Sequence, residues 1–170
     1  LIQGPGLAIV TNAGGPGVMA ADSMTAYGVA PVKLQPETLS RLDELLPAHW
    51  SRSNPVDILG DASPEKFRRV VEILMKAKEV NGLLIMFAPQ AMSRSTDVAA
   101  ALIELLRGRQ VPTFTAWMGG AEVEAGRDML NRAGISTFDT PERAVRAFMD
   151  LYQYSRNIEM LQEIPPALPY

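Results

Sequence analysis

The feature that most constrains the fold is the alternation of short, continuously apolar runs with helical patterns along the chain. Runs that stay apolar, rather than alternating with polar residues, are typical of strands buried on both faces. The two weaker runs each follow a glycine, Gly28 or Gly134, at an expected helix end. The sequence predicts strands at 7–12, 30–34, 82–87, 111–117 and 135–138.

Helical patterns fill the segments between these runs. Ser63 and Thr140 each precede a proline, which is a strong signal for a helix start because an N-cap hydroxyl is followed by a residue that needs no N–H partner. Helices are predicted over 16–27, 36–46, 95–109 and 122–132, with two more beginning at Pro64 and Pro141.

A strand–helix order repeated four or five times predicts a parallel sheet covered by helices on both faces, because right-handed crossovers place them there. Five strands with short connections favour a three-layer, flavodoxin-like α/β domain with strand order 2-1-3-4-5. The stretch from about Leu161 onward is rich in proline and has no periodicity, so we expect a linker or surface arm there.

Composition excludes several classes of function. The 170 residues contain no cysteine and one histidine, so disulfide scaffolds, thiolate metal sites and multi-histidine zinc sites are excluded. A net charge of -3 argues against nucleic-acid binding, and no apolar run reaches the ~20 residues that span a bilayer. We expect a cytoplasmic protein. The chain begins at Leu1 rather than Met, which suggests an excised piece of a longer protein.

The turn after the first strand is the main candidate site. Asn12 and Ala13 lead into Gly14, Gly15 and Gly17 at the start of a helix. Glycines permit close approach, and the free N–H groups of a first helical turn attract anions, so the turn suits a phosphate or carboxylate. The alternative is a tight strand-to-helix turn that needs glycine only for its geometry.

Other loops are expected at the same edge of the sheet. Asn54 and Asp57 precede a capped helix and either shape a pocket or meet a partner domain, or else form an Asx-type turn with acids at a helix entry. Gly119 and Gly120 open another helix, as a second anion site or as a plain connection. His49 has no carboxylate or nucleophile beside it in the sequence, which favours a surface or packing role.

Several motifs, in this order, resemble ADP-forming (NDP-forming) acyl-CoA synthetases, a family related to succinyl-CoA synthetase. The resemblance covers about residues 5 to 165 and points to the second flavodoxin-like CoA-ligase domain of that family. The segments that carry it are 7–22, 54–57, 117–120, 126–127, 138–145 and 154–157.

The resemblance implies a ligase that interconverts acyl-CoA, ADP and phosphate with free acid, CoA and ATP. In the family, a histidine of another domain carries the phosphoryl group, and paired helix N-termini point at it. Transferred to this chain, the stabilising residues are Asn12, Ala13, Gly14, Gly15 and Gly17, with Asn54, Asp57, Gly119 and Gly120 as pocket walls or domain contacts. The family's histidine motif is absent and His49 does not match it, so no catalytic residue and no metal ligand are assigned to this chain.

The resemblance also implies partners. We expect a CoA-ligase domain over residues 1–155 and a linker or C-terminal arm over 156–170, leading toward an ATP-grasp domain. CoA-binding, phosphohistidine-bearing and ATP-grasp domains would bind CoA, ADP or ATP and Mg²⁺, while this chain alone binds no cofactor and is inactive. It could form a homo-oligomer. Two alternatives remain open: a synthetase-like domain of a protein acetyltransferase or regulator, and a stand-alone flavodoxin-like module for a flavin or other phosphate ligand.

Overall fold

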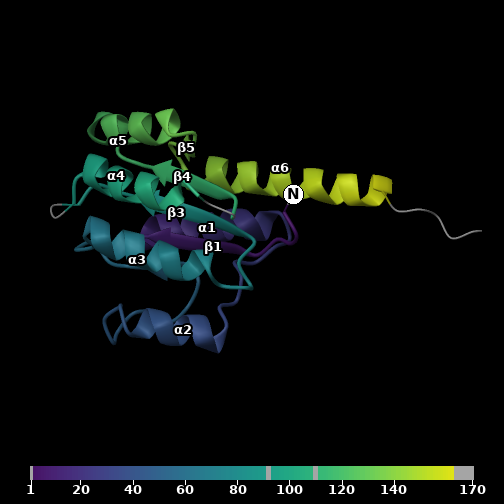
Figure 1. Cartoon of the computed structure of the whole chain (residues 1–170), viewed down its shortest axis with the longest axis horizontal. Helices are drawn as coiled ribbons and strands as arrows, with labels where there is room; N and C mark the ends of the chain where they lie inside the picture. The colour runs from purple at the N-terminus through teal and green to yellow at the C-terminus, as the bar shows by residue number, and fades with distance from the viewer. Residues whose placement is uncertain (1, 91–92, 109–110, 163–170) are drawn as a thin grey trace, which may run out of the picture.

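The computed structural model describes residues 2–90, 93–108 and 111–162, and shows one five-stranded sheet in which every pairing is parallel (Figure 1). The strand order is β2-β1-β3-β4-β5, so the flavodoxin-like order predicted from the sequence is confirmed. The strands are β1 (Leu7–Thr11), β2 (Val56–Asp57), β3 (Gly82–Phe87), β4 (Thr113–Trp117) and β5 (Ser136–Phe138). The helices are α1 (Gly14–Ala26), α2 (Pro36–Asp43), α3 (Pro64–Met75), α4 (Ser95–Leu106), α5 (Ala121–Arg132) and α6 (Pro141–Gln162).

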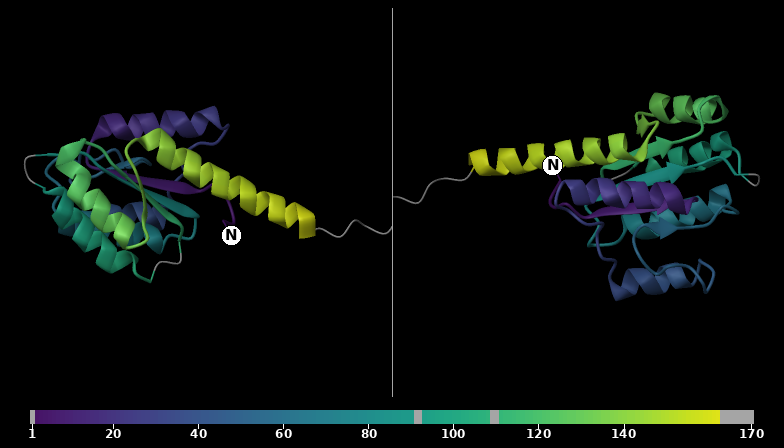
Figure 2. Two further views of the ribbon diagram at one scale, coloured as in Figure 1. Left: turned by 90° about the horizontal axis from the view of Figure 1, so that it is seen from above. Right: turned by 180° about the vertical axis from the view of Figure 1, so that it is seen from behind.

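Successive residues of the central strands point into two different cores, one on each face of the sheet. Leu7 and Ile9 of β1 pack with α1 and α6, whereas Ala8 and Val10 pack with the layer that contains α3, α4 and α5. Figures 1 and 2 show these two helical layers on opposite sides of the sheet. All five residues of β1 are buried, which is why the run shows no polar alternation in the sequence.

The predicted helix starts at Ser63 and Thr140 are confirmed. The Ser63 hydroxyl accepts a hydrogen bond from the Lys66 N–H at 3.1 Å, and Pro64 occupies the first helical position of α3. The Thr140 hydroxyl accepts from the Arg143 N–H at 3.4 Å at the start of α6. These caps satisfy N–H groups that have no partner within the helix.

The strand predicted at 30–34 is wrong, because this segment has no strand structure and the second strand lies at Val56–Asp57. Pro31 has no N–H to donate, and Val32 makes a single backbone bond to β1, from its N–H to the Leu7 carbonyl at 3.2 Å. The edge of the sheet is instead taken by β2, where Val56 pairs with Val10.

The last helix is longer than the domain needs. Its buried residues end at Ser155, whose hydroxyl accepts a hydrogen bond from the Ile2 N–H at 2.9 Å, and α6 then continues to Gln162 beyond the sheet (Figures 1 and 2). Residues 156–162 are therefore helical, and the rest of the expected linker, 163–170, lies outside the described residues. No helix in the described part of the chain is long and apolar enough to cross a membrane.

Candidate functional site at the carboxyl edge of the sheet

The strand order reverses between β1 and β3, and this is where open α/β sheets place their ligands. One buried side chain bridges the two loops at this point. The Asn12 amide nitrogen donates to the Ala88 carbonyl at 2.8 Å, and the Asn12 side-chain oxygen accepts from the Ala88 N–H at 2.9 Å. Asn12 thus fixes the loop after β1 to the loop after β3 and contacts backbone rather than open space.

The N-terminus of α1 is uncapped and faces outward. Ala13 is its N-cap residue, no side chain caps the helix, and its first turn contains no acidic residue. Gly14 and Gly15 are exposed, and a Cβ at Gly15 would meet nothing within 4 Å. The first turn of α1 therefore presents a positive helix end and accessible backbone to whatever approaches it.

Gly17 has a different role from its neighbours. It is buried, and a Cβ there would lie 3.2 Å from Thr11 Cγ2 and 3.4 Å from Pro55 Cβ. This glycine lets α1 pack closely on the sheet, whereas Gly14 and Gly15 lie at the open end. Close packing therefore explains Gly17, while the anion site stays a prediction for the open end at Gly14 and Gly15.

Sequence reasoning missed Thr11, the last residue of β1. Its hydroxyl accepts from the Ala13 N–H at 3.0 Å and donates to the Ala13 carbonyl at 2.7 Å. These two bonds set the conformation of the residue that begins α1. A threonine two residues before an uncapped helix start is a recognised turn signal that could have indicated this role.

Asp57 lies beside α1, as expected of a residue at this edge. Its Oδ2 atom is 3.3 Å from the position of a Cβ on Gly14, and its Oδ1 accepts a hydrogen bond from the Leu59 N–H at 2.9 Å. The structure therefore brings together Asp57, Gly14 and Gly15 at one end of α1.

Asn54 lies elsewhere, along the first half of β1 rather than at its carboxyl end. Its side-chain oxygen accepts from the Ile9 N–H at 2.8 Å, and its amide donates to the Leu7 and Val32 carbonyls at 2.9 Å each. Its polar contacts are with backbone of β1 and of Val32, so the structure does not bring Asn54 together with Asp57 and Gly14, and its role as a pocket wall or domain contact stays a prediction.

Gly119 and Gly120 connect β4 to α5 in conformations that favour glycine, with φ of +141° and +58°. A Cβ on Gly119 would lie 2.5 Å from Pro89 Cγ, in the loop after β3. These glycines permit a close approach between neighbouring loops, and Gly120 is exposed with open space around it.

A cleft of about 450 Å³ lies at this edge, between the starts of α4 and α5. Phe87 forms an apolar wall, and the buried hydroxyl groups of Ser93 and Ser95 already bond to backbone carbonyls. The Arg94 side chain is 82% exposed and pairs with Asp97 at 2.9 Å. The lining residues come from the end of β3, the loop after it and the starts of α4 and α5, so the cleft lies on the Ala88 side of the Asn12–Ala88 bridge.

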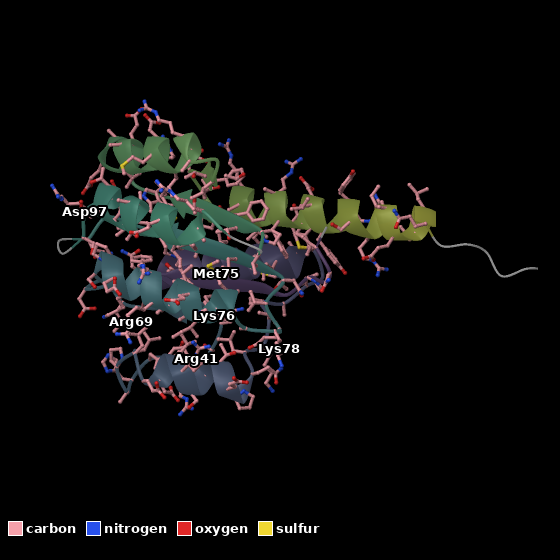
Figure 3. The ribbon with its side chains drawn as sticks, viewed as in Figure 1. Arg41, Arg69, Met75, Lys76, Lys78 and Asp97 are labelled. Atoms are coloured by element: carbon pink, nitrogen blue, oxygen red, sulfur yellow. The ribbon has the colours of Figure 1, made fainter. Side chains whose placement is uncertain are left out.

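Two places away from this edge do not form a comparable candidate site. A hollow of about 210 Å³ between α2 and α3 contains Arg41 and Arg69 but also Glu44 and Glu72, so its charges balance (Figure 3). His49 is exposed after α2 and makes no hydrogen bond or ion pair with the described part of the chain. Across residues 2–90, 93–108 and 111–162, no three acidic or histidine side chains gather in a way that could hold a metal ion.

A parallel sheet in this order, with helices on both faces, defines a flavodoxin-like α/β domain. A family model described as the Ligase-CoA domain matches residues 7–162, and the chain belongs to this family.

Similar proteins agree with that assignment. The chain is 41% identical over 150 residues to the ADP-forming acetate–CoA ligase I of Archaeoglobus fulgidus, covering 88% of this chain and 21% of that protein. It is 30% identical over 162 residues to the alpha subunit of the ADP-forming acetate–CoA ligase I of Pyrococcus furiosus, covering 91% and 34%.

A solved structure gives the same result. The dinucleotide-forming acetyl-coenzyme A synthetase 1 of Ca. Korarchaeum cryptofilum, in complex with phosphate and ADP, superposes with a TM-score of 0.87 at 28% identity. The match covers 96% of this chain and 36% of that one. The chain therefore spans about a fifth to a third of the length of these relatives.

Proposed function

We propose that this chain is the CoA-ligase domain of an ADP-forming acyl-CoA synthetase, which interconverts acyl-CoA, ADP and phosphate with free acid, CoA and ATP. The relatives that support this are ADP-forming acetate–CoA ligases several times longer than the chain. The activity is then a property of the longer protein, in which this domain supplies one wall of the site.

The role of this domain is electrostatic. The N–H groups in the first turn of α1, at Gly14 and Gly15, donate to a phosphoryl group carried on a histidine of another domain. Their partial positive charge is fixed before the group arrives, so no reorganisation is needed in the transition state. Asn12, Ala13 and Gly17 hold this helix end in place, and Asp57, Gly119 and Gly120 form walls or domain contacts around it.

The described residues do not fit a complete nucleotide, CoA or Mg²⁺ site. The first turn of α1 has no basic side chain to neutralise a polyphosphate, and no cluster of carboxylates within the described ranges could bind a cation. We assign CoA, ADP or ATP and Mg²⁺ to partner domains of the same protein.

The single observation that carries this proposal is the open, uncapped end of α1 at the switch point. Because Gly15 has no atom near its Cβ position, Gly15→Leu folds normally but covers the N–H groups. We expect ATP formation by the full-length enzyme to fall about a hundredfold, the scale of losing a preorganised donor.

The matched control is Ala26→Leu, an equally exposed position at the other end of α1, which should keep the parent rate. An unchanged rate in Gly15→Leu removes the glycine loop from the mechanism. The 170-residue chain alone should form no ATP from acyl-CoA, ADP and phosphate, and turnover by it would refute its assignment as a non-autonomous domain.

A further inference from the structure

The free end of α6 has apolar residues that no other part of the described chain covers. We call residues 154–162 the α6 overhang. Tyr154 is 57% exposed, and Leu161 is 81% exposed. Ile158 lies between them in the sequence, and Met160 beside them is 52% exposed. Of the large apolar side chains that are exposed in the described part of the chain, three lie here, and the other three, Val18, Met19 and Tyr27, lie on or just after α1.

These residues lie on one side of the helix. Tyr154, Ile158 and Leu161 are spaced by four and then three positions, the repeat that places side chains on a common helical face. Arg156 and Glu159 lie on other sides of the helix and carry opposite charges. The overhang is therefore an amphipathic helix end with an apolar stripe and no net charge on its polar side.

The overhang is held to its own domain mainly at its start, where the buried Ser155 hydroxyl accepts from the Ile2 N–H. The buried residues of α6 end at Ser155, and the helix then leaves the sheet and stands clear of the other elements (Figures 1 and 2). A helical end of this length is marginal in water without tertiary packing. A structural partner outside the described residues would stabilise it.

The overhang also lies within the region that matches the family, so it is not an extension specific to this chain. The Ligase-CoA family model extends to residue 162, the last residue of α6. The match to the Korarchaeum synthetase leaves only about seven of the 170 residues uncovered, fewer than the seventeen from 154 onward, so it reaches into the overhang. In that chain nearly two thirds of the residues lie outside the matched domain.

We propose that the α6 overhang is a docking helix, and that its apolar stripe packs against another domain encoded in the same reading frame. The partner surface is apolar and carries no strong charge, because the stripe offers no ionic group to pair with. This inference rests on the proposed function only in assuming a longer multidomain protein.

Size decides between a tethered domain and a second copy of this chain. Tyr154 and Leu161, which are exposed, and Ile158, which is partly buried, can bury at most a few hundred Å², well below the ~1,200 Å² of a specific interface between separate proteins. A domain joined to the same chain is present at an effective concentration on the order of millimolar, so a small apolar contact suffices to hold it.

The test is hydrogen exchange of the overhang amides, measured in the 170-residue chain and in the full-length protein from the natural reading frame. We expect exchange in the full-length protein to be at least about tenfold slower. Leu161→Ser in the full-length protein should restore most of the fast exchange. Its side chain is 81% exposed in this domain, so the substitution does not disturb folding.

The matched control is Arg156→Gln, an exposed position on another side of the same helix, which should leave the slow exchange intact. Equal exchange in the two proteins overturns the proposal, as does a Leu161→Ser effect no larger than that of the control. A reading frame with no further domain also overturns it. So does a dimer of the 170-residue chain, seen by sedimentation, that Leu161→Ser dissociates. A failure of Gly15→Leu to slow turnover leaves these outcomes unaffected, so the two proposals fail separately.

Discussion

Two asparagines in this domain take the place of backbone partners. Asn12 pairs with both backbone groups of Ala88, and Asn54 bonds to three backbone groups along and beside β1. A carboxamide has the same donor and acceptor groups as a peptide unit, so it can complete hydrogen bonding where a strand or loop is missing. In both cases the side chain fixes the position of the neighbouring backbone.

Removing the Asn54 side chain should destabilise the domain. Asn54→Ala removes the partner of the Ile9 N–H and of the Val32 carbonyl, while the Leu7 carbonyl keeps its bond from the Val32 N–H, and a buried group left unpaired costs about 1–3 kcal/mol. Urea unfolding should show this loss in the free energy of unfolding. The control Asn131→Ala, at an exposed position of α5, should change it by less than about 0.5 kcal/mol. Equal effects would mean that the Asn54 bonds add nothing to stability.

Glu79 makes the start of α2 sensitive to acid. Its burial raises the carboxyl pKa, but hydrogen bonds from the Gln35 N–H and the Thr38 hydroxyl outweigh this, so the pKa of Glu79 is held below its ordinary value of 4.5. A pKa lowered by folding stabilises the folded state above the unfolded value. That contribution is lost as the pH falls from about 4.5 through the folded pKa.

The prediction is that Glu79→Gln lowers stability at neutral pH and flattens its decline in acid. Unfolding midpoints measured as a function of pH would show the difference between Glu79→Gln and the parent shrinking below pH 4.5. Glu124→Gln, at an exposed position of α5, is the control and should follow the parent curve. A gap between Glu79→Gln and the parent that stays constant in acid contradicts the assignment.

Residue roles at the site were the least predictable part of the sequence. The sequence predicted the glycine turn as a whole, but not which glycine packs against the sheet and which stays open. That difference depends on Thr11 and Pro55, and the distance to Pro55 is set by the fold. Asn54 looked like a pocket residue because polar loop residues often are, and its contacts with β1 depend on a strand pairing that the sequence does not encode locally.

At the scale of elements, the helices were more predictable than the edge strand. Proline and N-cap hydroxyls mark α3 and α6 locally, and apolar runs mark β1, β3 and β4. The second strand was misplaced because 30–34 looks as apolar as a strand, while β2 is only two residues long and is defined by pairing with Val10 and Thr11. Strand pairing depends on contacts between residues far apart in the sequence, so local composition does not show which of two candidate segments forms the strand.

One helix contact depends on glycine in the middle of α5. A Cβ on Gly126 would lie 2.7 Å from the Ser95 carbonyl oxygen and 3.0 Å from Trp117 Nε1, and the first of these is backbone that cannot rotate away. We therefore expect Gly126→Ala to destabilise the domain by about 1–3 kcal/mol, although alanine favours helix. The free energy of unfolding, measured by thermal or urea unfolding, should show this loss.

The control for that prediction is Gly15→Ala, in the open first turn of α1, where a Cβ meets nothing within 4 Å. It should be neutral or stabilising by up to about 1 kcal/mol, because alanine restricts the unfolded chain. If Gly126→Ala proves as harmless as Gly15→Ala, the α5 helix can move away from α4 without cost.

At the scale of the whole molecule, α2 is more peripheral than the other elements. Leu42 of α2 belongs to the same core as α3 and the sheet, but the helix packs mainly against α3 (Figure 1). Its attachment depends on the buried Leu42 and on Trp50, whose indole N–H donates to Asp43 at 2.8 Å. An element held through one neighbour opens at lower free energy than the central sheet.

The two tryptophans report on these two parts separately, which gives the last prediction. Trp50 follows α2 in the chain and is buried. Trp117 is fully buried at the end of β4 and is stacked on Phe87, with ring centroids 5.4 Å apart. In protein labelled with 5-fluorotryptophan, the ¹⁹F resonance of Trp50 should lose its native position at lower urea concentration than that of Trp117. Trp50→Phe assigns the two signals. Coincident transitions would mean that α2 unfolds together with the sheet, and that its peripheral position costs it no stability.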